Sequence, residues 1–442
     1  MNSRSMVVTR RERAIVVGIA SRAIPRSVVE EHLDELSRLA ETAGGKVVDR
    51  FIQVRSAPDR ATAVGRGAVE EIGTALAEKK AGLVIFDDEL SPAQTRNLEE
   101  RWGDGVRVLD RSGLILDVFA AHARTREART QVELAQLQYL LPRLAGRYEH
   151  LSGLGGGIGG RGAGEQKLEL DRRKIRTRIA RLREDLSRIE TARSVQRRGR
   201  EGQFQVAIAG YTNAGKTSLF NRLTRESAYA ADRLFATLDS RVARARSRLL
   251  EGTLFIDTVG FVRKLPPALV ASFRSTLAEI RDADLVLHVL DASSPGVDDE
   301  RIVAVGVLQE LGVDPSKIVS VWNKRDLTPR VPAGVLAVSA RTGEGIDRLE
   351  AEIRRRRTPG EEVMELRVPY ASARSIAAAR ARYQVLDEND EGDCLRLRIA
   401  ALPSSLGPLR QYLASDSSTP KKTRGGTGEL PPVPELPRRR SS

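Results

Sequence analysis

The stretch that decides the fold is residues 204–217, FQVAIAGYTNAGKT, in which an apolar run leads directly into a glycine-rich turn. The turn fits the pattern GxxxxGK followed by Ser or Thr, and the next residues, SLFNRL, have helical spacing. A strand, this turn and a helix form a phosphate-binding loop, because glycines let backbone N–H groups wrap phosphate oxygens. Lys216 would reach the β- and γ-phosphates, and Thr217 would offer its hydroxyl to Mg²⁺. For this motif taken alone, a glycine-rich turn with a surface lysine is the simpler alternative.

Three more polar motifs follow apolar runs, in the order that a nucleotide-binding domain of this kind requires. Asp257-Thr-Val-Gly260 follows TLFI, Asn323-Lys-Arg-Asp326 follows IVSVW, and the Ser-Ala pair at 339–340 follows VLAV. The carboxyl ends of parallel strands meet at one edge of a sheet, so these motifs should converge. The Asp326 carboxylate would accept hydrogen bonds from the N1–H and 2-amino groups of guanine, which adenine lacks. The sequence therefore predicts GTP rather than ATP, bound to a doubly wound, mainly parallel α/β domain.

Each motif contributes residues to the predicted site. The predicted catalytic residues are Lys216, Thr237 and Gly260, and the predicted Mg²⁺ ligands are Thr217, Thr237 and, through water, Asp257. Thr237 is assigned because a first switch segment, between the helix after the phosphate-binding loop (P-loop) and DTVG, should supply a hydroxyl to Mg²⁺. Thr224 is the competing candidate. The predicted GTP-binding residues are Gly210, Tyr211, Thr212, Asn213, Ala214, Gly215, Lys216, Thr217, Ser218, Phe235, Ala236, Thr237, Leu238, Asp257, Thr258, Val259, Gly260, Asn323, Lys324, Arg325, Asp326, Ser339, Ala340 and Arg341.

Two positions depart from the usual hydrolysis machinery. Phe261 follows Gly260, where many GTPases have a Gln that orients the attacking water. Phe261 either packs under the second switch, the segment that follows DTVG, or leaves hydrolysis slow until a partner orders the site. We favour the second interpretation. Asn213 either stabilises the turn or ligates a K⁺ ion that stands in for an arginine finger. K⁺ is therefore a hypothetical cofactor beside GTP and Mg²⁺.

A chain of 442 residues should form two to four domains, and changes in pattern place their boundaries. Short apolar runs alternate with helical segments in two regions, which predicts two α/β domains. Between them, seams of Leu and Ile step by three and four on either side of GLGGGIGGRGAGE, as in paired helices. The predicted segments are an N-terminal tail at 1–11, a small α/β domain at 12–122, an antiparallel helical hairpin with a Gly-rich tip at 123–200, the P-loop domain at 201–357, a small α+β domain at 358–414 and a disordered tail at 415–442.

The charge balance points to an anionic partner. The formal net charge is +14, and such a field attracts nucleic acid, although solvated helix faces are the alternative reading. The basic residues expected near the base and tip of the hairpin are Arg124, Arg126, Arg129, Arg161, Arg172, Arg173 and Lys174. The single Cys394 indicates a reducing compartment, and no apolar run is long enough to span a bilayer. We therefore expect a cytoplasmic monomer without a membrane span.

Beyond these motifs, most of the chain resembles the HflX family of ribosome-associated GTPases, within the Obg-HflX-like P-loop GTPases. The segment between the two helices, followed by a strongly basic helix start, is the most specific part of this resemblance. The similar segments are AVGRGAVEEI, IFDDELSPAQTRNLEE, DRSGLILDVFAAHARTREARTQVELAQLQYLLPRL, GGGIGGRGAGEQKLELDRRKI, GYTNAGKTSLFN, LFATLD, DTVGFVRKLP and NKRD.

The resemblance implies a GTPase that binds the large ribosomal subunit through its N-terminal domain and helical hairpin. Its implied role is ribosome splitting, rescue or stress response, with a low basal rate that the partner stimulates. A GTP-switched scaffold for another RNA or protein, without ribosome-stimulated turnover, is the alternative. An ATP-dependent RNA-remodelling enzyme built on the N-terminal domain is disfavoured, because GRGAVEE at 65–71 lacks the lysine of a phosphate loop.

Overall fold

The computed structural model describes residues 12–103, 105–144, 163–198, 200, 202–226, 235, 240–264, 266, 269, 272–329 and 331–414. The predicted tails at 1–11 and 415–442 lie outside these residues, as does the predicted Gly-rich tip up to 162; the last part of that tip, 163–165, forms the start of a long helix instead. The chain forms two compact units that divide between Arg357 and Thr358. The first unit holds one parallel and one mainly parallel sheet and two long helices, and the second holds a small antiparallel sheet.

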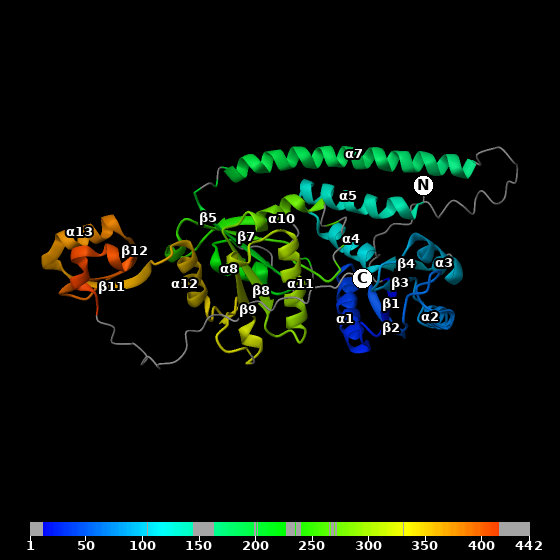
Figure 1. The fold of residues 1–442 in the computed structure, drawn as a ribbon, viewed down its shortest axis with the longest axis horizontal. Coiled ribbons are helices and arrows are strands. Elements are labelled where there is room, and N and C mark those ends of the chain that lie inside the picture. Colours follow the sequence, from blue (N-terminus) through cyan, green and yellow to red (C-terminus); the bar gives the residue numbers. More distant parts are fainter. Residues whose placement is uncertain are drawn as a thin grey trace, which may run out of the picture. The chain divides into compact units, whose positions relative to one another are not determined.

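The first sheet of unit 1 is parallel, with strand order β2-β1-β3-β4 and helices on both faces (Figure 1). Its core follows from alternation along β1, because Val16 packs towards α1 and α4 while Ile15 and Val17 pack towards α2 and α3. Helix α3 begins at a capping box made by Ser91 and Gln94. The elements are β1 (Arg13–Ala20), α1 (Arg26–Thr42), β2 (Lys46–Val54), α2 (Arg66–Glu78), β3 (Leu83–Phe86), α3 (Pro92–Trp102), β4 (Arg107–Asp110) and α4 (Arg111–His122).

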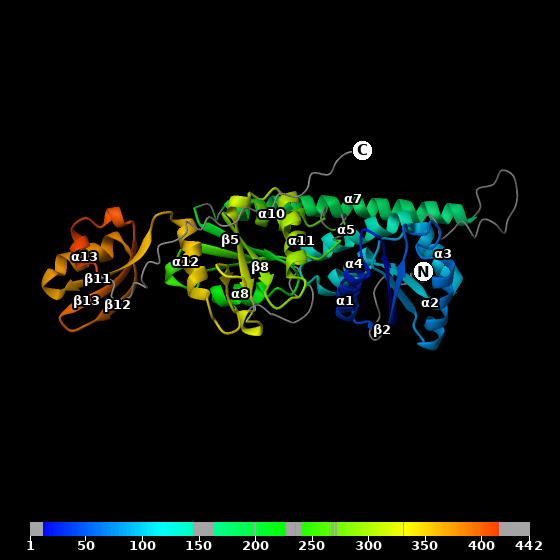
Figure 2. The ribbon, with the colours of Figure 1, turned by 60° about the horizontal axis from the view of Figure 1, so that its bottom comes forward.

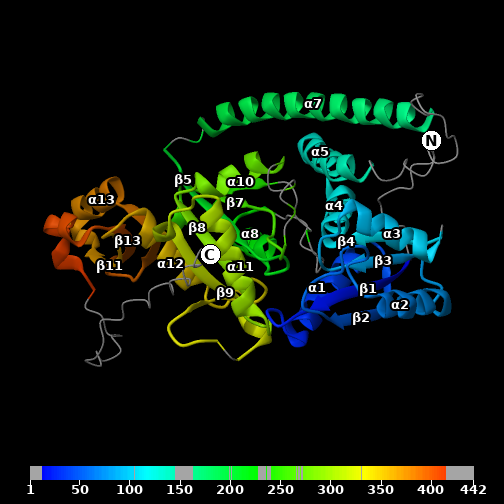
Figure 3. The ribbon, with the colours of Figure 1, turned by 45° about the vertical axis from the view of Figure 1, so that its right-hand side comes forward.

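Two long helices, α5 (Arg126–Arg143) and α7 (Ala163–Arg198), lie side by side (Figure 3). The predicted seams meet in an apolar cluster that includes Leu134, Ile179 and Leu182. Ion pairs join Arg178 to Glu133 and Arg193 to Glu127, and this order of partners shows that the helices run antiparallel. The seam predicted from the spacing of Leu and Ile is therefore present where the structure describes it.

The second sheet of unit 1 has six strands in the order β10-β9-β8-β5-β7-β6, all parallel except β6. Helices α10 and α11 cover one face and α8 and α12 the other, which is the predicted doubly wound arrangement (Figure 1). The antiparallel strand β6 at the edge was not predicted. The elements are β5 (Phe204–Gly210), α8 (Lys216–Leu223), β6 (Arg241–Arg244), β7 (Thr253–Asp257), α10 (Arg274–Arg281), β8 (Leu285–Asp291), α11 (Val297–Glu310), β9 (Ile318–Asn323), β10 (Leu336–Ala337) and α12 (Ile346–Arg357).

Unit 2 contains an antiparallel sheet of three strands in the order β11-β13-β12, with helix α13 beside it (Figure 2). The sequence predicted strand, helix and strand here and missed β12, whose second half, DEND, is polar and exposed. The elements are β11 (Glu362–Pro369), α13 (Ala373–Arg382), β12 (Gln384–Asp390) and β13 (Cys394–Ala401). None of the described helices is both long and apolar enough to cross a lipid bilayer. The predicted fold class is confirmed.

Candidate nucleotide site

The phosphate loop joins β5 to α8 and contains a buried lysine. Lys216 is only 6% exposed, and its ammonium donates to the Tyr211 carbonyl oxygen at 2.8 Å. Burial lowers the pKa of Lys216 to about 8, while the Asp257 carboxylate raises it and the nearby Lys324 lowers it. A buried cation of this kind is poorly solvated, so a triphosphate beside it would replace the lost hydration.

Close packing requires glycine at two positions of the site. Gly215 has φ +86°, and a Cβ there would lie 2.3 Å from the Asn323 amide nitrogen. A Cβ on Gly260 would lie 2.9 Å from both the Lys216 ammonium and the Cα of Thr212. Gly260 therefore lies directly against the phosphate loop, as its predicted contact with the γ-phosphate requires.

One side chain connects the predicted base-reading loop, Asn323 to Asp326, to the phosphate loop and to the loop that holds the Ser-Ala pair at 339–340. The Asn323 amide nitrogen donates to the Ala214 carbonyl oxygen at 2.9 Å, and its amide oxygen accepts from the Ala340 N–H at 3.0 Å. Lys324, in the left-handed region at φ 62°, pairs with Asp291 at 2.6 Å. Three motifs that are distant in sequence thus meet at the carboxyl ends of β5, β9 and β10.

Asp326 is held in a fixed orientation for hydrogen bonding. The Ser339 hydroxyl donates to its Oδ1 at 2.6 Å, and the Arg341 guanidinium lies 2.6 Å from its Oδ2. The Ser339 hydrogen bond, opposed by desolvation and helped by Arg341, lowers the pKa of Asp326. The carboxylate is therefore ionised at neutral pH and can act only as an acceptor, which suits a base edge with two donors. The Arg325 guanidinium instead donates to the Thr328 carbonyl oxygen.

Two of the predicted Mg²⁺ ligands meet at the start of α8. The Thr217 hydroxyl donates to Asp257 Oδ2 at 2.8 Å, and Asp257 is fully buried. Hydroxyl and carboxylate oxygens are the ligands that Mg²⁺ prefers, so this pair fits the ion. The third predicted ligand, Thr237, lies outside the described residues, as do Ala236 and Leu238. The competing Thr224 donates its hydroxyl to the Phe220 carbonyl oxygen within α8, which favours a structural role.

Several other predicted site residues make contacts within the protein itself. The Thr258 hydroxyl donates to the Ile208 carbonyl oxygen, and Val259 is buried in the apolar core. Asn213 has a left-handed φ of 62°, which agrees with a turn-stabilising role and does not decide the K⁺ hypothesis. Ser218 lies in the first turn of α8. The Thr212 N–H donates to the Phe261 carbonyl oxygen, linking the phosphate loop to the segment after DTVG.

Both switch segments pack against the N-terminal sheet domain through aromatic rings. Phe119 of α4 lies 4.5 Å from Phe235 and 5.5 Å from Phe273, measured between ring centroids. Phe261 and Val262 are each 1% exposed and belong to the same apolar cluster as Phe119. The Phe235 ring therefore packs on α4, so the predicted nucleotide contact of this residue would have to come from its backbone.

A buried polar network accompanies these apolar contacts. The Tyr211 hydroxyl donates to Glu35 at 2.7 Å and accepts from the Arg263 N–H at 2.9 Å. Arg111, which is 1% exposed, pairs with Glu35 and Asp87 and donates to the Arg263 carbonyl oxygen at 3.1 Å. The N-terminal domain thus holds both the phosphate loop and the segment that follows DTVG.

Lys264 completes this network on the same segment. Its ammonium lies 2.7 Å from both Asp87 and Asp88. Burial raises the pKa of Asp87. A hydrogen bond with His32 and the charges of Arg111 and Lys264 outweigh this effect and hold the pKa of Asp87 well below its usual range. Sequence reasoning missed Glu35, Asp87, Asp88 and Arg111, because they lie far from the motifs along the chain. Asp291, which pairs with Lys324, is the one missed residue that the local sequence pattern could have indicated. It ends an apolar strand, as the nucleotide-binding motifs do.

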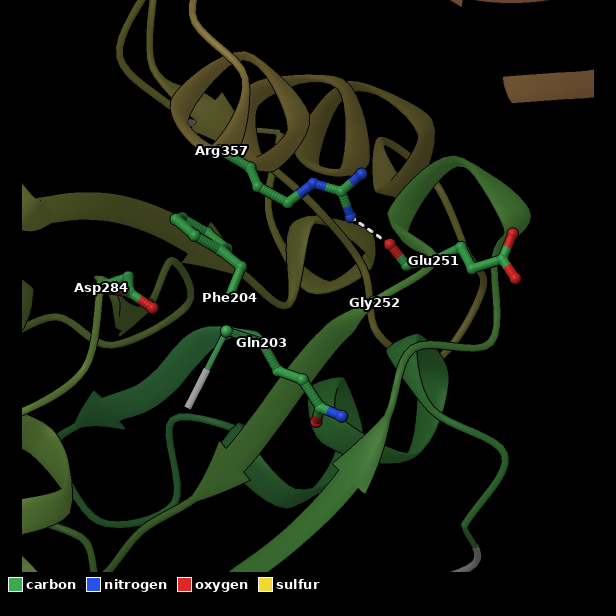
Figure 4. Close-up of a pocket in the computed structure, with 7 residues that line it drawn as sticks. Gln203, Phe204, Glu251, Gly252, Asp284 and Arg357 are labelled. Carbon is green, nitrogen blue, oxygen red and sulfur yellow. Dashed lines mark hydrogen bonds between the residues drawn. The ribbon is translucent and has the colours of Figure 1, made fainter. Parts of the chain in front are cut away.

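A pocket of about 490 Å³ lies at the opposite end of the sheet, near the amino ends of β5 and β7. Figure 4 shows Arg357 reaching across it to the Glu251 carbonyl oxygen, with Phe204 and Asp284 on the neighbouring wall. The nucleotide motifs lie at the carboxyl ends of the strands, so this pocket is separate from the candidate site.

Comparison with known proteins gives matches along most of the chain. Residues 30–120 match the family model described as GTP-binding GTPase N-terminal, residues 122–200 the GTP-binding GTPase Middle Region, and residues 205–324 the 50S ribosome-binding GTPase. A GTPase HflX of Caldanaerobacter subterraneus subsp. tengcongensis is 44% identical over 410 residues, covering 92% of this chain and 94% of the relative. The GTPase HflX of Escherichia coli (strain K12) is 44% identical over 335 residues, covering 72% of this chain and 77% of the relative. Among solved structures, a complex of SsGBP with GDP is 22% identical with a TM-score of 0.45, covering 77% of this chain and 97% of that one.

Proposed function

This chain belongs to the HflX family of GTPases, and from that premise we propose that it regulates the large ribosomal subunit. It binds GTP and hydrolyses it, as its family and its GTPase domain indicate. The finer role that we propose is nucleotide-dependent binding to the large subunit during ribosome splitting, rescue or stress. The description of the model matched by residues 205–324, a 50S ribosome-binding GTPase, supports this partner.

The observation that carries the proposal is the attachment of the second switch to the N-terminal domain. Arg263 and Lys264 follow DTVGFV directly, and both contact Arg111, Asp87 or Asp88 of that domain. Hydrolysis requires the switch to take up a geometry around the γ-phosphate. A partner that moves the N-terminal domain would therefore change the switch, and GTP bound at the switch would change the affinity for that partner.

A continuous path leads from the helical hairpin to this switch. Tyr139 and Arg143 of α5 both donate to the Asp110 carboxylate, each at 2.7 Å. The next residue is Arg111, which contacts Glu35, Asp87 and the Arg263 backbone. Contacts made by the hairpin on a ribosomal partner would thus reach the nucleotide site through adjacent residues at the start of α4.

The basic residues of the hairpin suit ribosomal RNA. Arg124, Arg126 and Arg129 are exposed near the base of the hairpin, and Arg173 and Lys174 are exposed in the first half of α7. Guanidinium and ammonium groups without neighbouring aromatic rings favour contacts with phosphates and with RNA shape over base stacking. We therefore propose the hairpin and the N-terminal domain as the principal ribosome-binding surface. Of the two remaining basic residues of this set, Arg172 is half-buried and Arg161 lies outside the described residues.

Within the site, each described motif has a distinct proposed role. The phosphate loop and Lys216 bind the triphosphate, Asp326 selects guanine, and the Gly260 N–H contacts the γ-phosphate. Mg²⁺, held by Thr217 and through water by Asp257, would neutralise charge that develops on the phosphates during transfer. Phe261 is a buried phenyl ring that cannot orient a water, so we propose slow hydrolysis until the partner rearranges the switch.

The proposal is tested by co-sedimentation of the full chain with purified large ribosomal subunits. The nucleotide is a non-hydrolysable GTP analogue, GDP or none, each with Mg²⁺, and Lys216→Ala serves as the variant that cannot hold the triphosphate. We expect tight binding with the analogue, weak binding with GDP and no effect of the analogue on Lys216→Ala. Equal binding in all three states would contradict nucleotide-dependent association and leave a GTP-switched scaffold for another partner as the better account.

A further inference from the structure

The exposed edge of the P-loop domain carries a group of arginines that the nucleotide site does not use. We call Arg225, Arg241, Arg244 and Arg246 the edge arginines; all four are exposed. Arg241 and Arg244 belong to β6, the last strand of the six-stranded sheet. A backbone bridge between Thr224 and Ala245 brings the neighbouring Arg225 to the same edge. The segment from 240 to 250 contains no acidic residue, so this edge is strongly positive.

The charges at this edge are not neutralised within the part of the chain that the structure describes. Other exposed arginines of this domain, such as Arg281 and Arg355, pair with Asp282 and Glu352. The edge arginines form no ion pair with any described residue. Nearby, one guanidinium nitrogen of Arg200 is buried and has no hydrogen-bond partner among the described residues. Unsatisfied buried donors are uncommon in proteins, and an external acceptor would explain this one.

A groove of about 650 Å³ brings these side chains together. Arg200, Arg225 and Arg244 line it, and Glu226 is the only carboxylate among the described residues of its lining. The remaining lining residues are Gln203, Val242, Ala243, Ala245 and Leu254. Three guanidinium groups around one groove present planar, paired donors, which match phosphate oxygens better than they match any neutral ligand.

We propose that this groove, with the edge arginines, holds the phosphate backbone of RNA in the large ribosomal subunit. The inference rests on the proposed function and adds a second contact surface, separate from the helical hairpin. None of the described residues that line the groove is aromatic, so the contact reads backbone phosphates and shape rather than stacked bases.

The position of β6 links this contact to the nucleotide. Arg241 pairs in register with Asp257, which ends β7 at the nucleotide site, and Arg244 pairs with Leu254 further along the strand. Strand β6 also begins directly after the first switch segment. RNA bound along this edge would therefore contact a strand that is paired with β7 at Asp257, and the nucleotide state would alter its affinity for the groove.

A simpler role for arginines on an edge strand is protection, because charged side chains block pairing between exposed sheet edges. The two roles differ in what substitution does. Loss of protection causes self-association, whereas loss of a phosphate contact weakens RNA binding and reduces its dependence on salt.

The test compares two double variants with equal loss of positive charge, both loaded with a non-hydrolysable GTP analogue. One is Arg225→Ala with Arg244→Ala, and the matched control is Arg281→Ala with Arg355→Ala, which removes paired arginines of the same domain. Binding to large ribosomal subunits and to purified ribosomal RNA is measured across a range of salt concentrations. Affinity for the GTP analogue shows whether each variant is folded, and sedimentation of the free protein shows whether it stays monomeric.

We expect the edge variant to bind RNA about tenfold or more weakly at low salt. The magnitude of the slope of log K against log salt should fall by about one to two, because each phosphate contact contributes roughly 0.7–0.9 to it. The control should behave like the unsubstituted chain. An edge variant with unchanged affinity and slope would overturn the RNA proposal, and self-association alone would assign these arginines to protection. If the unsubstituted chain binds purified RNA in this edge-dependent way but not large subunits, the large subunit is excluded as the partner, and the edge arginines remain a phosphate-contact surface for another RNA; binding to neither overturns both proposals.

Discussion

Raising the pH should weaken GTP binding, because the buried ammonium of Lys216 loses its proton earlier than an ordinary lysine. Burial lowers the pKa of Lys216 from 10.5 to about 8, and only the protonated form attracts the triphosphate. Protonated Lys216 thus falls from about three quarters of the free protein at pH 7.5 to about one tenth at pH 9. The dissociation constant should therefore rise about eightfold over this range, whereas a lysine with an ordinary pKa would change it by only a few per cent.

The assay is titration of a fluorescent GTP analogue into the full chain between pH 7.5 and pH 9, at constant ionic strength and constant Mg²⁺. The matched control is Lys216→Arg, which stays protonated throughout and reports any change that comes from ionisation of the guanine ring. We expect the eightfold rise for the native chain after this control is subtracted. A flat profile in which the two proteins behave alike would refute the claim that Lys216 is poorly solvated in the free protein.

Three further predictions follow from the same contacts. Lys216→Met should abolish GTP binding. At neutral pH it should also stabilise the protein without nucleotide by up to about 3 kcal/mol, seen as a higher Tm. The reason is that Lys216 has a lower pKa in the folded than in the unfolded protein, so the proton that it carries below pH 8 reduces the free energy of unfolding. Asp326→Asn should weaken GTP binding by about 10² or more, since two hydrogen bonds to a charged acceptor are each worth roughly 1.5–3 kcal/mol, while the Tm changes little; unchanged affinity in calorimetry would remove Asp326 from the base-reading role. Lys264→Ala should raise basal GTP hydrolysis several-fold by releasing the second switch from Asp87 and Asp88, with Lys264→Arg as the control, and an unchanged or lower phosphate-release rate would argue against restraint by these contacts.

The P-loop domain could be predicted because each parallel strand is a short apolar run that ends in a polar motif. Strands β5, β7 and β9 are followed by GYTNAGKT, DTVG and KRD, so sequence order and strand type together imply one site. Strand β6 escaped prediction because RVAR is short and half charged, and its pairing depends on β7 rather than on its own pattern. Strand β12 was missed for a similar reason, since its second half is polar and exposed.

The contacts between the N-terminal domain and the switches could not be predicted from local patterns. Glu35, Asp87 and Arg111 lie on different elements, and each reads in the sequence as an ordinary charged residue. Only the folded chain brings them against Tyr211 and the segment after Gly260. The buried Phe261 was weighed at the sequence level between packing and slow hydrolysis. Its burial bears out the packing, and the rate stays a prediction.

The most direct test of the account is the rate of GTP hydrolysis by the full chain, alone and with large ribosomal subunits, at two salt concentrations. Lys216→Ala gives the background, because it removes the phosphate-binding ammonium. The account predicts a slow basal rate that rises strongly with subunits and falls towards the basal rate at high salt, where phosphate contacts weaken. No rise at either salt concentration, with tight GTP binding retained, would contradict a partner-stimulated ribosomal GTPase.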